Sequence, residues 1–90
     1  MREADVKIIN SLGLHARAAA QLVRLAGKFK SRITMIRRDN AVIADAKSIL
    51  SVLTLAASKG TKLQLIVAGI DETEALSAIE ELIVQGFGEI

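Results

Sequence analysis

The only histidine of the 90-residue chain, His15, lies in the segment GLHARAAAQLV, residues 13–23. A neutral imidazole nitrogen is a nucleophile near pH 7, so this side chain could accept a group from a donor. A single histidine in a loop is more often a solvated residue than a reactive one, and its neighbours must decide between the two. Gly13 can relax the turn before it, and Arg17 offers a cation that could pair with an anion.

A helix is expected to begin directly after His15, because apolar residues recur at helical spacing over residues 16–29. The first N–H groups of a helix have no partner inside it, and together with the helix dipole they form an anion site. Arg17 is unfavourable there by a few tenths of a kcal/mol, which suggests that it serves something other than the helix. Since the sequence has no Gly-rich nucleotide loop, the site is typical of a carrier of phosphoryl groups rather than of an ATP-binding enzyme.

The remaining apolar pattern alternates between period 2 and period 3.6, which predicts strands and helices in turn. Strands are expected over residues 5–9, 32–37, 41–45 and 61–69, and helices over 16–29, 47–57 and 71–86. The turn residues 38–40 make the second and third strands a hairpin. Asp71 is expected to cap the last helix, with Glu74 completing a variant of the capping box.

This order, β-α-β-β-α-β-α, predicts an α+β fold in one domain over residues 1–90. The expected architecture is an open-faced β-sandwich, in which a four-stranded antiparallel sheet carries three helices on one face.

The composition argues against several kinds of site and partner. Without cysteine there is no disulfide or thiolate site, and one histidine does not indicate a metal centre, so no cofactor or metal is expected. No apolar run approaches the roughly 20 residues of a membrane span, and no signal peptide is indicated, so we expect a cytoplasmic protein without membrane insertion. Residues 1–47 hold ten Lys or Arg and four Asp or Glu, whereas residues 48–90 hold two and six. The basic first half predicts an acidic partner.

Two segments resemble one known family. GLHARAAAQLV resembles its active-site motif Gly-x-His-Ala-Arg, and AKSILSVLTLAASKGTKLQLIVAG, residues 46–69, is similar to its second site around Lys-Ser-Ile. With the acidic closing helix, the likeness covers nearly the whole chain. The chain is therefore identified as a member of the HPr family, the phosphocarriers of the phosphoenolpyruvate-dependent sugar phosphotransferase system, including the nitrogen-related paralogue NPr.

The resemblance implies roles for three residues. His15 would be phosphorylated on Nδ1 by Enzyme I, which draws the phosphoryl group from phosphoenolpyruvate, and would pass it to an EIIA domain. Arg17 would contact the phosphoryl group. Ser48 would be the regulatory serine that HPr kinase/phosphorylase modifies in organisms that have that enzyme. Three positions depart from the family pattern: Ala18 stands where most members have Pro, Ala46 replaces a frequent Gly before the Lys-Ser pair, and Ala20 stands where Thr or a small residue is common.

A docking surface is expected beside His15, because the segment 47–57 is apolar on too many sides to be buried completely. Val52 and Leu55 are expected in the core. Three further apolar residues are expected to stay exposed, and we call them the apolar patch: Ile49, Leu50 and Leu53. An exposed apolar patch usually marks an interface. A polar stripe on the first helix, which alone would be typical of a solvated face, is expected to be a basic rim that steers acidic partners. This basic stripe comprises Arg17, Gln21, Arg24 and Lys28.

Three other interpretations stay open. Ser48 could be no more than an N-cap. A small RNA-binding module has the same outline, but it stacks bases on strand aromatics, and here Phe29 and Phe87 lie outside the expected strands, so no nucleic-acid partner is expected. A regulatory homologue of the nitrogen-type branch would dock on partners without carrying phosphate, which the presence of His15 disfavours. We expect a monomer, because a carrier must expose His15 to two partners in turn.

Overall fold

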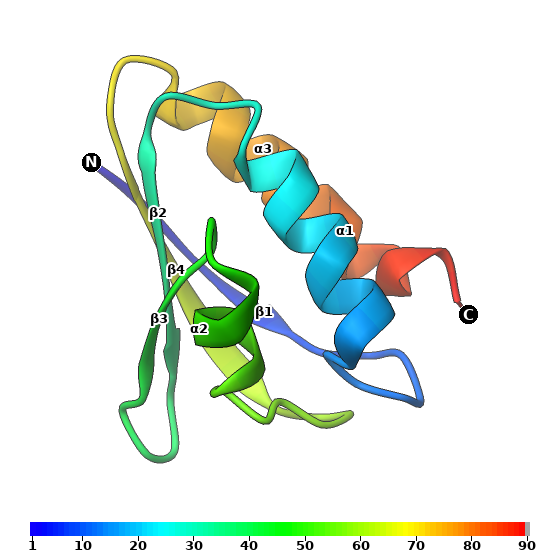
Figure 1. The fold of residues 1–90 in the computed structure, drawn as a ribbon. Coiled ribbons are helices and arrows are strands. Elements are labelled where there is room, and N and C mark those ends of the chain that lie inside the picture. The colour runs from blue at the N-terminus through cyan, green and yellow to red at the C-terminus, as the bar shows by residue number, and fades with distance from the viewer. Residues whose placement is uncertain (90) are drawn as a thin grey trace.

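The computed structural model describes residues 1–89 and contains the predicted sequence of strands and helices. The elements are β1 (Arg2–Lys7), α1 (Ala16–Ala26), β2 (Arg32–Arg37), β3 (Ile43–Asp45), α2 (Ile49–Leu53), β4 (Lys62–Ala68), α3 (Glu72–Val84) and the 3-10 helix η1 (Gly86–Gly88). All neighbouring strands pair antiparallel in the order β1-β4-β2-β3. The three α-helices lie on one side of this sheet (Figure 1), which confirms the open-faced α+β sandwich. Among residues 1–89, no helix is long and apolar enough to span a membrane.

The core lies between the helices and one face of the sheet. Successive strand residues point to opposite faces, and the inward side chains of β4 are fully buried: Leu63, Leu65 and Val67. They share the core with Leu22 of α1 and Ile79 of α3, which are also fully buried. Burying one such side chain contributes about 1.5–3 kcal/mol, so this shared layer holds α1 and α3 against the sheet.

Several element boundaries differ from the prediction. The first strand spans residues 2–7 instead of 5–9, because its early residues pair with the far end of β4, whereas Ile8 leaves the ladder and bonds residues 60 and 61 instead. The first helix ends at Ala26 instead of residue 29. Beyond it the bonds tighten to i→i−3 spacing at Lys28 and Phe29, after Gly27.

The second helix is also shorter than predicted, covering residues 49–53 instead of 47–57. Ser48 caps its start, and the chain turns at Ala56, whose φ of 48° ends any helix. Strand β2 has the predicted bounds, and β3, β4 and α3 differ from theirs by at most two residues at either end.

The predicted side-chain cap of Asp71 is wrong. Asp71 occupies the N-cap position of α3, but its side chain makes no cap hydrogen bond. The carboxylate instead accepts hydrogen bonds from the backbone N–H groups of Lys30 (2.8 Å) and Ser31 (2.9 Å) and from the Ser31 hydroxyl (2.5 Å). The Ser31 hydroxyl, followed by the Lys30 N–H, lowers the pKa of Asp71 from 3.8 to about 2. Asp71 therefore joins the start of α3 to the loop between α1 and β2.

Candidate functional site

His15 is the N-cap residue of α1, in extended backbone conformation. Its Nδ1 accepts a hydrogen bond from the backbone N–H of Arg17 (3.3 Å), and its carbonyl accepts one from Ala19 (2.8 Å). Its Nε2 forms a short contact with a carboxylate oxygen of Glu89. Since Nδ1 accepts and a carboxylate can only accept, these partners assign the ring proton to Nε2. The lone pair of Nδ1 therefore lies at the N-terminus of α1.

The turn before His15 requires glycine at position 13. Gly13 has a φ of 67°, and an added Cβ would lie 2.6 Å from the carbonyl oxygen of Ala57 and 2.9 Å from Cα of Ser58. The next residue, Leu14, donates its N–H to that same Ala57 carbonyl (2.8 Å). The turn is thus packed directly on the chain that follows α2, and the predicted use of Gly13 is confirmed.

Two residues near His15 were missed by the sequence analysis. Asn10, which is fully buried, donates from Nδ2 to the carbonyl of Gly13 (2.8 Å) and to the Glu89 carboxylate (2.8 Å). Hydrogen bonds from Asn10 and then His15, with the charge of Arg17 adding to them, lower the pKa of Glu89. Because 74 residues separate His15 from Glu89, no local pattern could have paired them. The only signal is the Gly-Phe-Gly of η1, which marks a tight turn.

Arg17 lies in the first turn of α1 with its side chain exposed. Its positive charge contributes to the lowered pKa of Glu89. The first turn holds no acidic residue. Nδ1 therefore lies beside the backbone N–H groups and the positive end of the helix dipole, which favour an anion, and Arg17 adds a positive charge in the same turn. Among residues 1–89, no three His, Cys, Asp or Glu side chains are grouped as metal ligands would be.

A family model described as "PTS HPr component phosphorylation site" matches residues 2–85. The chain belongs to the HPr family. It is 49% identical to the phosphocarrier protein HPr of Cupriavidus necator over 89 residues, covering 99% of this chain and 98% of the relative. The crystal structure of HPr-C-His from Thermoanaerobacter tengcongensis superposes with a TM-score of 0.92 at 40% identity, covering 100% of this chain and 99% of that one. A crystal structure of an HPr dimer from the same organism gives a TM-score of 0.76 at 40% identity, covering 99% and 100%.

Membership of the HPr family confirms the resemblance drawn from the two motifs. HPr proteins are phosphocarriers of the phosphotransferase system, and that coarse function holds for this chain. The family match favours a phosphocarrier over an RNA-binding module.

The apolar patch of this HPr-family chain is exposed as expected. Leu50 is 75% exposed, and Ile49 and Leu53 are 39% and 38% exposed, whereas Val52 and Leu55 are buried. In Figure 1, α2 lies beside the half of α1 that begins at His15. Apolar side chains are thus held in water on the same side of the molecule as the N-terminus of α1.

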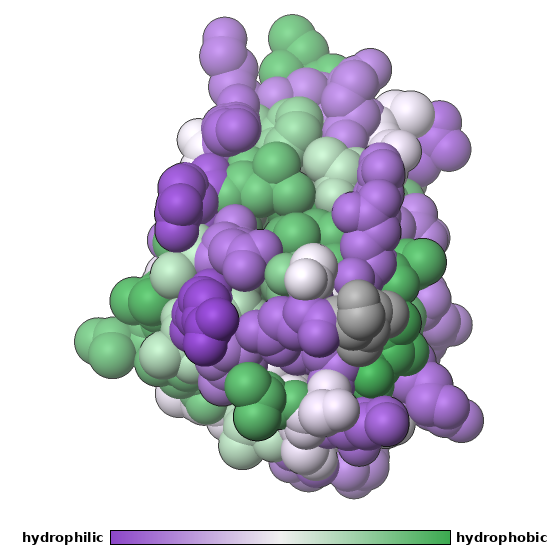
Figure 2. Space-filling model, turned by 90° about the vertical axis from the view of Figure 1, so that its right-hand side faces the viewer, coloured by the Kyte–Doolittle hydropathy of each residue, from purple (hydrophilic) through white to green (hydrophobic). Residues whose placement is uncertain are grey.

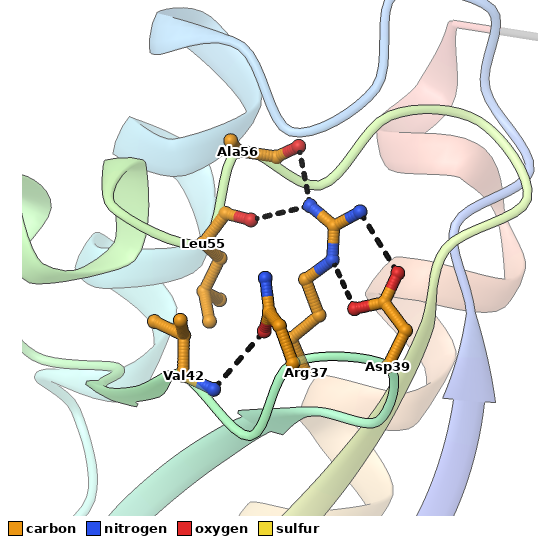
Figure 3. A network of polar contacts seen from close by, with 6 residues as sticks. Arg37, Asp39, Val42, Leu55 and Ala56 are labelled. Atoms are coloured by element: carbon orange, nitrogen blue, oxygen red, sulfur yellow. Dashed lines mark hydrogen bonds and ion pairs between the residues drawn. The ribbon is translucent and has the colours of Figure 1, made fainter.

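Arg37, at the end of β2, holds the chain that follows α2. Its Nη1 donates to the carbonyl oxygens of Leu55 (2.9 Å) and Ala56 (3.0 Å), as Figure 3 shows. Asp39 orients the guanidinium through two bonds, to Nε (2.7 Å) and Nη2 (3.1 Å). Arg37 and Asp39 therefore tie the segment that leaves α2 to the end of β2.

The basic stripe lies on the side of α1 that faces α3. Figure 2 shows hydrophilic side chains on both sides of a hydrophobic strip on this face of the molecule. A shallow hollow of about 210 Å³ lies here, bordered by Gln21, Arg24, Leu25, Lys28 and Leu82. Since α1 lies between α2 and α3 (Figure 1), the helix itself separates the stripe from the apolar patch. Its role as a rim for partners stays a prediction.

Ser48 is the N-cap of α2, as its place at a helix start predicted. Its hydroxyl oxygen accepts a hydrogen bond from the backbone N–H of Ser51 (3.3 Å). Ala46, where the family often has Gly, is fully buried, and its N–H donates to the carbonyl of Ile33 (3.0 Å). The regulatory role of Ser48 stays a prediction.

Proposed function

We propose that this chain is a cytoplasmic phosphocarrier that accepts a phosphoryl group on Nδ1 of His15 from Enzyme I and passes it to an EIIA domain. One observation carries this proposal: His15 caps α1 with Nδ1 directed at the helix N-terminus, while Nε2 is occupied by Glu89. A ring held by its other nitrogen presents a single nucleophilic atom.

The transfer needs no further base at Nδ1, because this nitrogen already carries a lone pair. The lone pair attacks the phosphorus atom, a nitrogen–phosphorus bond forms, and the donor's bond to phosphorus breaks with its electron pair returning to the donor. The Nε2 proton stays on the ring. Passing the group to an EIIA domain reverses these roles, and the chain ends unchanged. It is therefore a carrier and not an enzyme by itself.

Arg17 supports the phosphorylated state in this proposal. A phosphoryl group on Nδ1 would bring its negative charge to the free N–H groups of α1, where charge-assisted hydrogen bonds are strongest. The exposed guanidinium in the first turn of α1 is free to turn toward it.

Partners dock, we propose, on the apolar patch and the basic stripe, which lie on either side of α1. The two surfaces leave the His15 end of α1 between them, so a partner covering both would approach Nδ1 directly. Such partners would carry an apolar spot and acidic residues. A monomer suits this role, because each partner in turn needs the same face.

The carrier function is tested by labelling with phosphoenolpyruvate and Enzyme I. Label that is acid-labile and base-stable is expected on the wild-type protein and absent from His15→Ala. Retention of label in His15→Ala, or its absence from the wild-type protein with a cognate Enzyme I, would refute the proposal. Running the assay with Enzyme I of the sugar branch and of the nitrogen-related branch shows which of the two supplies the group.

The docking surface is tested with two exposed apolar side chains at opposite ends of the molecule. Leu50 of the apolar patch is 75% exposed, and Ile70, in the turn between β4 and α3, is 88% exposed. Leu50→Ala is expected to raise the KM of Enzyme I for this chain by about fivefold to tenfold, as loss of an interface anchor does. Ile70→Ala is the matched control and should leave KM unchanged. Equal effects of the two substitutions would contradict the assigned surface.

We propose Ser48 as a regulatory phosphorylation site in hosts that have HPr kinase/phosphorylase. A phosphate there would place roughly −1.5 to −2 charges next to Ile49 and Leu50, where it would weaken contact with an acidic, apolar partner. The kinase with ATP should label the wild-type protein and Ser51→Ala, but not Ser48→Ala. Label that persists in Ser48→Ala would rule out this residue.

A further inference from the structure

The C-terminal segment is folded back onto the N-terminus of α1 by an unusual run of backbone conformations. Gly86, Phe87 and Gly88 have φ values of 60°, 56° and 75°, all in the left-handed region. Phe87 is only 3% exposed, so its burial compensates for a conformation that non-glycine residues avoid. Figure 1 shows this segment beside the start of α1. The result is that Glu89 lies against His15.

Asn10 fixes the carboxylate from the other side. Both hydrogens of its Nδ2 are used, one on Glu89 and one on the carbonyl of Gly13, in the turn that leads to His15. The opposite orientation of the amide would place its oxygen against two acceptors, so only this orientation is compatible with its neighbours. It leaves Oδ1 buried without a partner among residues 1–89. The fold tolerates an unpaired buried oxygen here, which points to a role for the position of Nδ2.

We propose that Asn10 and Glu89 are positioning residues for His15. Glu89 accepts a hydrogen bond from Nε2–H, which keeps the ring proton on Nε2 and leaves Nδ1 without hydrogen. Asn10 holds Glu89 and the Gly13 turn in place beside the ring by donating to both. This inference rests on the proposed carrier function. Neither residue touches the transferred group; both act through the imidazole.

Glu89 has a second effect that follows from its charge. When Nδ1 gives its lone pair to phosphorus, the ring retains its Nε2 proton and gains positive charge. A carboxylate that accepts a hydrogen bond from that proton stabilises the charged ring. In other nucleophilic sites, a group bonded to the second nitrogen orients the reacting imidazole in the same way. The side chains of His15 and Glu89 are 23% and 16% exposed, so water weakens this interaction less than it would at an open surface.

¹⁵N NMR of His15 reports which ring nitrogen carries the proton, and the measurement needs no partner protein. At about pH 9, where an imidazole is neutral, the shifts of Nδ1 and Nε2 give the tautomer populations. We expect the Nε2-protonated form to dominate in the wild-type protein and in Glu89→Gln, whose amide oxygen still accepts a hydrogen bond from Nε2–H. Glu89→Ala and Asn10→Ala should move toward a mixture of the two tautomers. Glu81→Gln, which changes an exposed carboxylate of α3, is the matched control.

Rates of phosphoryl uptake from Enzyme I then separate position from charge. Glu89→Ala should lower the rate roughly 10- to 100-fold, as loss of a group that orients a reacting imidazole does. Glu89→Gln should fall between Glu89→Ala and the wild-type protein, because it keeps the acceptor and loses the charge. Asn10 and Glu89 both lie outside the apolar core, and circular dichroism verifies that each variant is folded.

The outcomes distinguish this inference from the carrier function on which it rests. Tautomer populations in Glu89→Ala equal to those of the wild-type protein overturn the positioning role, whatever the labelling shows. Equal uptake rates in Glu89→Gln and the wild-type protein overturn the role of the charge. Absence of label on the wild-type protein overturns the carrier function, and the NMR result still decides what Glu89 does to the ring.

Discussion

Replacement of Gly13 by alanine should be among the most damaging single-methyl changes near His15. Two separate effects add at this position. The φ of 67° lies in the left-handed region, where a residue with a Cβ costs about 1–2 kcal/mol. The new Cβ would also lie 2.6 Å from the carbonyl oxygen of Ala57, against the 3.4 Å at which ordinary contact begins.

The second effect can be given a magnitude from the bond that it disturbs. Relief of the close contact moves the turn away from Ala57, whose carbonyl accepts the N–H of Leu14 at 2.8 Å. Losing such a bond costs about 0.5–1.5 kcal/mol. With the backbone strain, Gly13→Ala should lose about 2–3 kcal/mol of the free energy of unfolding, which is a fall in Tm of roughly 10–20 °C for a domain of this size.

Gly60 provides the matched control, because its φ is also positive, at 92°, but an added Cβ would meet nothing within 4 Å. Gly60→Ala should lose only the backbone strain, about 1–2 kcal/mol. Gly27→Ala, at a right-handed position, should be neutral or slightly stabilising. Urea unfolding gives the three free energies. If Gly13→Ala and Gly60→Ala lose the same amount, the contact with Ala57 is not what makes glycine necessary at position 13.

Three further changes have expected outcomes. Asp71 has its pKa lowered from 3.8 to about 2 by its hydrogen bonds, so its contribution to stability is present above pH 4 and is lost as pH falls toward 2; urea unfolding of Asp71→Asn should show a flatter decline over that range, and an unchanged slope would contradict the assignment. Leu22→Ala empties a fully buried position and should cost about 2–5 kcal/mol in the same assay; a loss below 1 kcal/mol would mean that α1 is not packed as described. Arg37→Met should lower Tm and speed hydrogen exchange of the α2 amides while leaving those of α3 unchanged, since the guanidinium holds the carbonyls that follow α2; equal exchange in both helices would remove Arg37 from that role.

The exposed apolar patch shows that a short apolar helix has more apolar side chains than a small fold buries. Val52 of α2 and Leu55, two residues after its end, are buried, while Leu50 projects into water. A five-residue helix has too few positions to separate a core face from a polar face when nearly all of its residues are apolar. Hydrogen bonds from Arg37 tie the residues after this short helix to the end of β2.

Where sequence-based expectation failed, the cause was competition from distant partners. Asp71 had the residue type and position of an N-cap, but two N–H groups and a hydroxyl from the loop before β2 bind its carboxylate instead. The second helix has helical spacing over residues 47–57, yet it ends at Leu53 and the chain turns at Ala56. Periodicity reports which residues face the core and does not report which loop will be packed against them.

By itself, the sequence determined the order of strands and helices, the antiparallel hairpin, the buried faces and the placement of His15 at the start of α1. These depend on residues within one or two turns of each other, so their signals are local. Tertiary structure alone decided that Glu89 and Asn10 hold the ring of His15, that Arg37 holds the end of α2, and that the basic stripe faces α3. Those contacts join residues that are far apart in the chain, and they exist only because packing of both segments on one sheet brings their polar groups within hydrogen-bond distance.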